Sequence, residues 1–346
     1  MENVTPSGTT ENDGPASSQL ERQILAVFLG LIVVLGTVGN MIVILAVLLS
    51  HKLRTKMNLF VVNLSFADFL TSLHLVWIIV AFLSEDGWPL PDELCVWCGF
   101  VLITCIGASV YTLACIAINR LVLIRYGQAA YRILCRPVIM IGMIATIWTI
   151  PLFMASIPLI ADFGELGYSS RYRTCLKNHA HKYAKAYDIL LSLTYYPVST
   201  AVIIFSYFKV FLYLRSRVKK LAPGVAEATV SSVMQETELR NRQGQQEARP
   251  NLRVRLDKRQ VQVTKNMFYV VCLFFMCTTP YGLTLLCDQQ VCLRLASYAA
   301  VILSLNSCIN PVVYATKHPD FKLVIRCILM CRWKKIPQRV KFFGDS

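Results

Sequence analysis

The sequence predicts an all-α membrane protein, a seven-transmembrane helix bundle followed by a short C-terminal amphipathic helix. Three observations support this fold class. The 346 residues are 55% hydrophobic and only 16% charged, whereas soluble domains carry about 25% charged residues. The mean hydropathy is positive, at +0.51. Finally, the chain contains seven apolar runs of 20 or more residues, long enough to cross a bilayer core of about 30 Å.

These runs are almost free of Asp, Glu, Lys and Arg, the one exception being Asp68 in the second run. A helix inside a soluble protein rarely extends so far without a charge, and seven such helices in series exclude an ordinary soluble fold. The runs are Gln23–Ser50, Met57–Leu83, Leu94–Asn119, Pro137–Ala161, Ile189–Phe208, Asn266–Cys287 and Leu295–Thr316.

Charges in the loops predict the orientation. The first loop, His51–Lys56, carries three Lys or Arg residues, and the next, Ser84–Glu93, carries four acids and no base. The positive-inside rule therefore predicts an extracellular N-terminus and a cytoplasmic C-terminus. The multi-pass chain is expected in the plasma membrane. The loop Asp162–Lys185 is an exception, since it is basic yet falls outside. The net charge of +15 is concentrated in such loops, so no nucleic-acid partner is expected.

Three regions follow from this division. Residues 1–22 are expected to be a disordered extracellular segment with a glycosylation sequon at Asn3. Residues 23–316 form the membrane domain, with 218–253 as a flexible third intracellular loop. Residues 317–346 form an amphipathic helix and tail, in which Phe321, Leu323, Val324, Ile328 and Leu329 are expected at the membrane interface. Cys327 and Cys331 are four residues apart there and are either palmitoylated or simply membrane-facing thiols.

Polar residues inside the spans carry the functional argument. An ionisable residue within a membrane is a functional hypothesis by default, and Asp68 needs partners facing the bundle interior. The candidates are Asn40, Ser109, Asn306, Ser307 and Asn310. A carboxylate with several neutral oxygens suits a hard monovalent cation such as sodium. A hydrogen-bonded structural network with a protonated Asp68 is the alternative.

Taken together, these residues resemble the rhodopsin-like class of G-protein-coupled receptors over about Gln23 to Cys331. The motifs occur in order, one set per span, and that order makes the resemblance specific. They are Gly39-Asn40, Leu64-Ser-Phe-Ala-Asp68, Cys95 with Asn119-Arg120, Trp148, Phe274 with Cys277 and Pro280, and Asn310-Pro-Val-Val-Tyr314 followed by Phe321. Within the class, Asn119-Arg120 and the residues from Asp162 to Tyr168 resemble the melatonin-receptor-like, moody-like and medium-chain fatty-acid receptor group.

The resemblance implies roles for particular residues. Cys95 should pair with Cys175, and Cys287 with Cys292. Asp68, Ser109, Asn306, Ser307 and Asn310 fall on the sodium-site positions of the class. Arg120 should contact a heterotrimeric G protein, with Tyr314 and Tyr207 closing around it, and Val110, Phe274 and Pro197 should form the core switch. The class also implies arrestin, a receptor kinase and membrane lipids as partners, and it implies that the chain is not an enzyme.

Three departures from the class pattern make this an atypical member. The acidic partner of Arg120 is replaced by Asn119, which supplies no charge pairing. We therefore expect the inactive conformation to be less strongly stabilised and the receptor to show measurable basal signalling. Thr278 stands where the class usually has a tryptophan, between Cys277 and Pro280. Leu121 replaces the tyrosine that commonly follows the arginine.

The sequence limits the identity of the ligand mainly by excluding certain ligand classes. Ser304 occupies the position of the opsin lysine, so a retinal Schiff base is excluded by chemistry and no cofactor is expected. Leu102 occupies the position where amine receptors carry an aspartate. The expected pocket is apolar beneath a basic loop, which suits an anionic amphiphile such as a lipid, or an acidic peptide, unless the loop is merely solvated. Its residues are Leu102, Ile103, Ile106, Ile189, Tyr281, Leu285 and Ala300, with Arg171 and Arg173 above.

A secondary transporter is the alternative class. It would show internal repeats and usually more charges within the membrane, and neither is present in this sequence. One carboxylate and one histidine, His74, in the same span do not make an intramembrane catalytic site.

Overall fold

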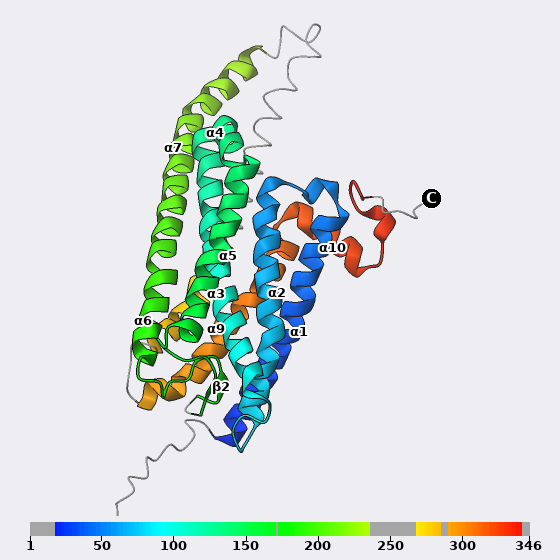
Figure 1. Ribbon diagram of the computed structural model, residues 1–346. Helices are drawn as coiled ribbons and strands as arrows, with labels where there is room; N and C mark the ends of the chain where they lie inside the picture. Colours follow the sequence, from blue (N-terminus) through cyan, green and yellow to red (C-terminus); the bar gives the residue numbers. More distant parts are fainter. Residues whose placement is uncertain (1–17, 171, 236–267, 285–289, 341–346) are drawn as a thin grey trace, which may run out of the picture.

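A computed structural model of the chain describes residues 18–170, 172–235, 268–284 and 290–340. In it, long helices pack side by side into a bundle (Figure 1). The labelled helices of the membrane domain are α1 (Gln19–Leu49), α2 (Lys56–Leu83), α3 (Asp92–Leu121), α4 (Gly127–Leu134), α5 (Pro137–Ile160), α6 (Ala184–Tyr195), α7 (Pro197–Gln235) and α9 (Gln290–Lys317). The shorter elements are η1 (His51–Leu53), η2 (Val122–Tyr126), β1 (Tyr168–Ser169), β2 (Thr174–Cys175), α10 (Pro319–Leu329) and η3 (Trp333–Lys335).

The seven predicted spans are present among the described residues. Six spans are long and apolar enough to cross a membrane, and the apolar helix Phe268–Thr284 supplies the remaining one. The span that begins with α3 is the most buried of them, whereas α1 and α5 expose large apolar side chains on their outer faces. An exposed apolar face is stable when the surrounding solvent is lipid. The fold class predicted from the sequence is therefore confirmed.

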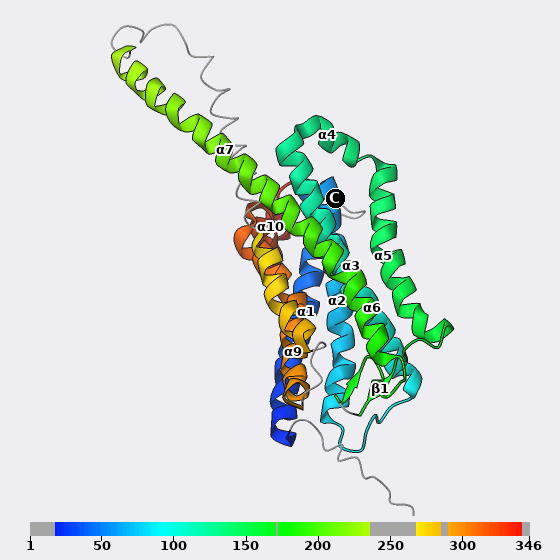
Figure 2. The ribbon, with the colours of Figure 1, turned by 90° about the vertical axis from the view of Figure 1, so that its left-hand side faces the viewer.

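The fifth span is not one continuous helix. The sequence predicts a single run over Ile189–Phe208, but α6 ends at Tyr195 and α7 begins at Pro197. Proline lacks an N–H group and its ring clashes with the preceding turn, so the ladder is interrupted there. Beyond the membrane, α7 continues to Gln235, so the first half of the predicted loop 218–253 is helical, and residues 236–253 lie outside the described residues. Figure 2 shows α7 projecting beyond the other helices.

A loop was expected after the third span, and the structure has helix there instead. The chain leaves α3 through η2, a wider turn of π-helix, and continues into α4. The two helices are joined at Gly127, whose φ of 79° is disfavoured for residues with a Cβ atom. This arrangement brings Tyr131 of α4 back toward the end of α3.

At the opposite end of the bundle from α4 and α10, the loop between α5 and α6 folds into a small hairpin (Figure 1). Its strands are antiparallel, with Tyr168 opposite Cys175 and Ser169 opposite Thr174. We call residues 168–175 the loop hairpin. Two-residue strands give too short an alternating pattern to be predicted from sequence.

The C-terminal region departs from the expectation of a helix lying freely on the membrane. In α10, Phe321, Val324 and Ile328 are buried against the bundle, and only Leu323 and Leu329 of the predicted interface residues are exposed. Residues 336–340, which we call the tail segment, then pair with the end of α1. Its contacts are Val340 N–H to Leu49 O at 2.9 Å, His51 N–H to Gln338 O at 3.0 Å, and Ser50 Oγ to Pro337 O at 2.7 Å.

Candidate functional site

Asp68 lies in the middle of α2 and is almost completely buried. One carboxylate oxygen accepts a hydrogen bond from Ser109 Oγ of α3 at 3.0 Å, and the other accepts one from Asn310 Nδ2 of α9 at 2.7 Å. Within the described ranges, no basic side chain lies at ion-pair distance from this carboxylate. The carboxylate is thus held by neutral donors from two other helices.

The other predicted partners of Asp68 are placed nearby. Asn306 and Ser307 of α9 are buried and line the same cavity as Asp68 and Ser109. Asn40 of α1 lies further out in the network, since its side-chain amide donates to the carbonyl oxygens of Gly36 at 2.9 Å and Ser307 at 2.7 Å. Asn40 thus lies outside the predicted sodium site. The five predicted sodium-site residues line one cavity or contact its lining, and Asp68 is hydrogen-bonded directly to two of the others, Ser109 and Asn310.

This cavity extends from the carboxylate of Asp68 up to the loop that carries the hairpin, and its volume is about 110 Å³. Four predicted pocket residues line it, Leu102, Ile106, Tyr281 and Ala300. Two other predictions are wrong. Ile103 is absent from the lining and packs instead with Met154 and Tyr187, and Ile189 is 48% exposed on the outer face of α6. Predicting a span's inward face from one sequence fails where the register is unknown.

Two basic residues of the loop above the cavity are engaged by contacts elsewhere in the protein. Arg173 donates to the carbonyl oxygen of Ser84 at 2.7 Å and does not line the cavity. Lys177 forms an ion pair with Asp188 of α6, and both side chains are largely buried. Burial lowers the pKa of the Lys177 ammonium, and the neighbouring carboxylate opposes that shift because it stabilises the charged form.

The loop residues that do line the cavity are Tyr172, Thr174, Leu176 and His179. Among them only His179 carries a basic group. Its Nδ1 lies 3.3 Å from Ser169 Oγ, its Nε2 lies 3.9 Å from the Asp188 carboxylate, and its ring is 4.4 Å from that of Tyr172. The sequence predicts His179 as one of the basic residues of the loop above the cavity, and the structure places it in the cavity lining.

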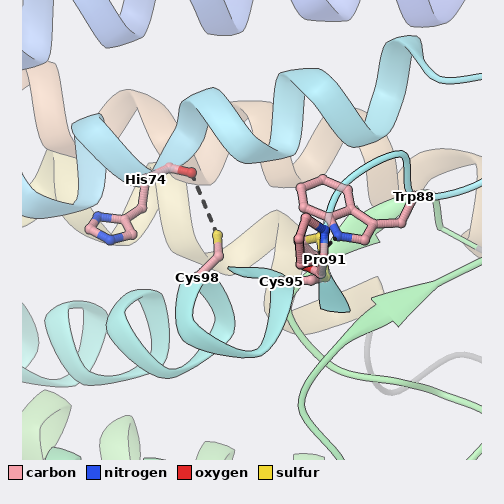
Figure 3. The surroundings of a disulfide bond; sticks show 6 residues. His74, Trp88, Pro91, Cys95 and Cys98 are labelled. Carbon is pink, nitrogen blue, oxygen red and sulfur yellow. Dashed lines mark hydrogen bonds between the residues drawn. A yellow bond between two sulfur atoms is a disulfide. The ribbon is translucent and has the colours of Figure 1, made fainter. Parts of the chain in front are cut away.

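The predicted disulfide between Cys95 and Cys175 is present and anchors the loop hairpin to the start of α3 (Figure 3). Beside it, Trp88 Nε1 donates to Pro91 O at 3.1 Å, and Cys98 is a free thiol that donates to His74 O at 3.6 Å. Gly99 lies one turn further along α3, and a Cβ atom there would collide with the carbonyl oxygen of Leu176. The disulfide and this close approach together fix the loop over the cavity.

At the other end of α3, Arg120 is buried. Its neighbours among the ionisable groups are Tyr207 of α7, Tyr131 of α4 and Tyr314 of α9. In the part of the chain that is described, no carboxylate pairs with it, and Arg120 Nε and the hydroxyls of Tyr207 and Tyr314 have no hydrogen-bond partner in the protein. The structure thus places both predicted tyrosines against the arginine, although Tyr207 follows Pro197 at an unusual spacing.

Asn119 does not take over the role of the missing acid. Its amide donates to Cys115 O at 2.9 Å, one turn back along α3, and its Oδ1 lies 4.0 Å from the thiol of Cys135, at the end of α4. The same region is held by Lys56, which donates to Cys135 O at 2.9 Å. Asn119 therefore connects α3 to the segment after α4 rather than to Arg120.

The predicted switch residues lie between these two regions. Val110 and Phe274 belong to one buried cluster, and Phe274 and Thr278 line the cavity. Pro280 lies inside the helix Phe268–Thr284 and Pro197 starts α7. The sequence-predicted switch thus borders the floor of the cavity.

The palmitoylation prediction fits Cys331 better than Cys327. Cys327 is buried and its thiol donates to Lys335 O at 3.6 Å, whereas Cys331 is exposed and lies beyond the end of α10 with a φ of 53°. The two thiols are therefore not on one helix face. Asn3, Arg171, Leu285 and Cys287 lie outside the described residues, and the side chain of Cys292 is not described either.

Comparisons with known proteins agree with this geometry. Residues 39–314 match the model of the 7 transmembrane receptor (rhodopsin family). The chain is 26% identical to the human melatonin receptor type 1B over 316 residues, which are 86% of this chain and 75% of that protein. It is 26% identical to the Drosophila melanogaster receptor moody over an alignment that covers 92% of this chain and 53% of that protein.

A solved structure, that of squid rhodopsin, superposes with a TM-score of 0.72 at 18% sequence identity, over 99% of this chain and 94% of the other. At that identity the likeness concerns the fold, while the family match covers most of the chain. The buried carboxylate, the disulfide-anchored hairpin and the buried arginine all lie within the matched residues. The chain belongs to the rhodopsin family of seven-transmembrane receptors, and it is a receptor rather than an enzyme.

Proposed function

We propose that this receptor transmits the binding of a small extracellular amphiphile to a heterotrimeric G protein. The observation that carries the proposal is the cavity beneath the loop hairpin. It is walled mainly by apolar side chains, and His179 is the basic group at its outer end. A cavity of this kind is the default ligand site of a helical bundle.

The size of the cavity supports a small ligand over a peptide. Its volume of about 110 Å³ is below the several hundred Å³ of ordinary ligand pockets, so a slim molecule fits it best. A peptide would have to bind over the loop hairpin instead.

The polar or anionic head of the amphiphile is placed at His179 rather than at the arginines that the sequence suggested. Lys177 is paired with Asp188, and Arg173 is engaged with Ser84. A histidine at the cavity wall offers a donor to a carboxylate or a carbonyl group at neutral pH. This arrangement requires the hairpin end of the bundle to be extracellular and the α4 end to be cytoplasmic, in a receptor of the plasma membrane.

The test is a ligand screen of fatty acids, other lipids, peptides and small amines, read as nucleotide exchange on purified G protein. For the agonist found, we expect His179→Gln to lower the potency at least severalfold and Arg173→Gln to leave it unchanged. The reverse pattern would reject the placement of the head group. Substrate flux through reconstituted vesicles without nucleotide exchange would reject the receptor function in favour of a transporter.

The cytoplasmic part of the proposal rests on Arg120. It is buried among tyrosine hydroxyls with no ionic partner in the described chain, so moving it toward a G protein breaks no salt bridge. Asp68, with Ser109 and Asn310, is proposed to bind a sodium ion that favours the inactive state. Arrestin and a receptor kinase are further partners that membership of the family suggests.

A further inference from the structure

The ligand cavity and the buried carboxylate are not separated from one another. One continuous cavity is lined at its outer end by Tyr172 and His179 and at its inner end by Asp68 and Ser109. The rest of the lining combines apolar side chains, such as Leu75 from α2 and Ile106 from α3, with hydroxyl-bearing ones, such as Thr71 and Ser304. A group that enters beneath the loop hairpin therefore has a path to the carboxylate.

Thr278 explains why the path is open. It lies on the cavity wall beside Phe274, and its hydroxyl turns back toward its own helix, 3.5 Å from Phe275 O. The side chain is small, and its polar atom is directed at the backbone. A large aromatic side chain at this position would fill much of a cavity of about 110 Å³ and would separate the two ends.

The inner end of the cavity offers hydrogen-bond acceptors, and no basic side chain of the described chain already occupies them. An ionised carboxylate has about four lone-pair positions, and the hydrogen bonds from Ser109 and Asn310 occupy two of them. Asn306 and Ser307 add amide and hydroxyl groups to the same wall. Since no basic side chain of the described chain pairs with Asp68, an entering cation would meet a buried carboxylate without a counter-charge, and charge attraction is strong in the protein interior.

We propose that the inner end of the ligand is a small cationic nitrogen donor, such as a primary ammonium, that binds Asp68 directly and excludes a monovalent metal ion from that site. The ligand class is then a slim molecule with an apolar middle, a polar group at His179 and an ammonium at the other end. This inference rests on the proposed function, because it assumes that the cavity is the ligand site.

The experiment uses the purified full-length receptor and n-hexylammonium chloride as the probe. The thermal unfolding midpoint is measured against probe concentration in sodium chloride and in N-methyl-D-glucamine chloride of equal ionic strength, with n-hexanol as the uncharged probe of equal length. We expect hexylammonium to raise the midpoint, sodium to increase severalfold the concentration needed, and hexanol to have little effect. A ligand that binds only the folded state raises the midpoint in proportion to its occupancy.

Substitutions distinguish the contribution of the Asp68 carboxylate from that of the open passage leading to it. Asp68→Asn should abolish the stabilisation by both hexylammonium and sodium. Thr278→Trp should abolish the hexylammonium effect and retain the sodium effect, whereas Thr278→Val, which keeps the passage open, should retain both. If Thr278→Trp does not fold, Ile106→Phe narrows the same passage from α3.

Two results would overturn the inference. The first is a hexylammonium effect that sodium does not reduce or that survives filling of the passage. The second is stabilisation by sodium without any by hexylammonium, which would make the inner end an ion site only. Neither measurement uses a G protein, so a failure here is distinguishable from a failure of the proposed signalling, which nucleotide exchange reports.

Discussion

The two ends of α3 hold their polar groups in opposite ways. At the hairpin end, Cys95 is covalently bound to Cys175, and in the same loop Lys177 is paired with Asp188. At the α4 end, Arg120 is buried, and within the described chain it has no ionic partner and the hydroxyls of Tyr207 and Tyr314 have no hydrogen-bond partner. The difference indicates that the hairpin end is held rigidly by fixed contacts, whereas the described contacts at the α4 end leave Arg120 without a fixed ionic partner.

The largest expected effect is at the hairpin end. Cys175→Ser removes a crosslink between residues 80 apart in the sequence, which should lower the free energy of unfolding by about 4 kcal/mol in the chain-entropy account. Thermal unfolding of the purified receptor measures this effect. Cys331→Ser, at an exposed free thiol, is the control. Equal midpoints for the two variants would show that the hairpin end is not held by this bond.

The second-largest effect is expected from breaking the buried ion pair between Lys177 and Asp188. Asp188→Asn leaves the Lys177 ammonium buried without a counter-charge, and breaking a buried pair in this way costs about 3 kcal/mol. Asp162→Asn is the matched control, since the Asp162 side chain is 94% exposed beside His181 and should matter by less than about 1 kcal/mol. A loss of stability that is the same for both variants would argue against a fixed ion pair.

At the α4 end, Arg120→Leu should raise the stability of the protein, whereas the two preceding substitutions should lower it. Replacing a buried, unpaired guanidinium with an apolar side chain should raise the free energy of unfolding by about 2 kcal/mol, while ligand-stimulated nucleotide exchange falls to background. Arg125, which lies over the ring of Tyr213 at 5.6 Å, supplies the control variant Arg125→Leu. If Arg120→Leu were destabilising and still active, Arg120 would be a structural residue.

The smallest effect should come from restoring an acid. Asn119→Asp places a carboxylate next to Arg120, and a coupling of about 1 kcal/mol would reduce ligand-free nucleotide exchange about fivefold. Asn119→Ala removes the hydrogen bond to Cys115 O without adding charge and should not reduce it. Unchanged basal exchange in Asn119→Asp would mean that the missing acid does not determine basal signalling.

The same contrast explains what the sequence could and could not predict. Asp68, Ser109 and Asn310 were predicted together because each is a polar residue in an apolar span and must face the interior. Arg173 was wrongly assigned to the pocket, since nothing in a loop sequence shows that its guanidinium reaches Ser84. His179 was predicted in the basic loop above the pocket, but the sequence did not show which basic residues of that loop line the cavity. The break at Pro197 was foreseeable from proline chemistry, and Tyr207 lies beside Arg120 as the sequence predicted, although its spacing from Pro197 is unusual.

Attachment of the tail segment to the end of α1 has a consequence for how the receptor responds to its membrane. An amphipathic helix that contacts only the membrane interface takes a depth and tilt that depend on the thickness of the bilayer. Here α10 is fastened on two sides, by Phe321 and Val324 in the bundle core and by the pairing of Ser50 with the tail segment. Its angle is therefore a property of the polypeptide, and it should stay constant when the receptor moves between thin and thick membranes.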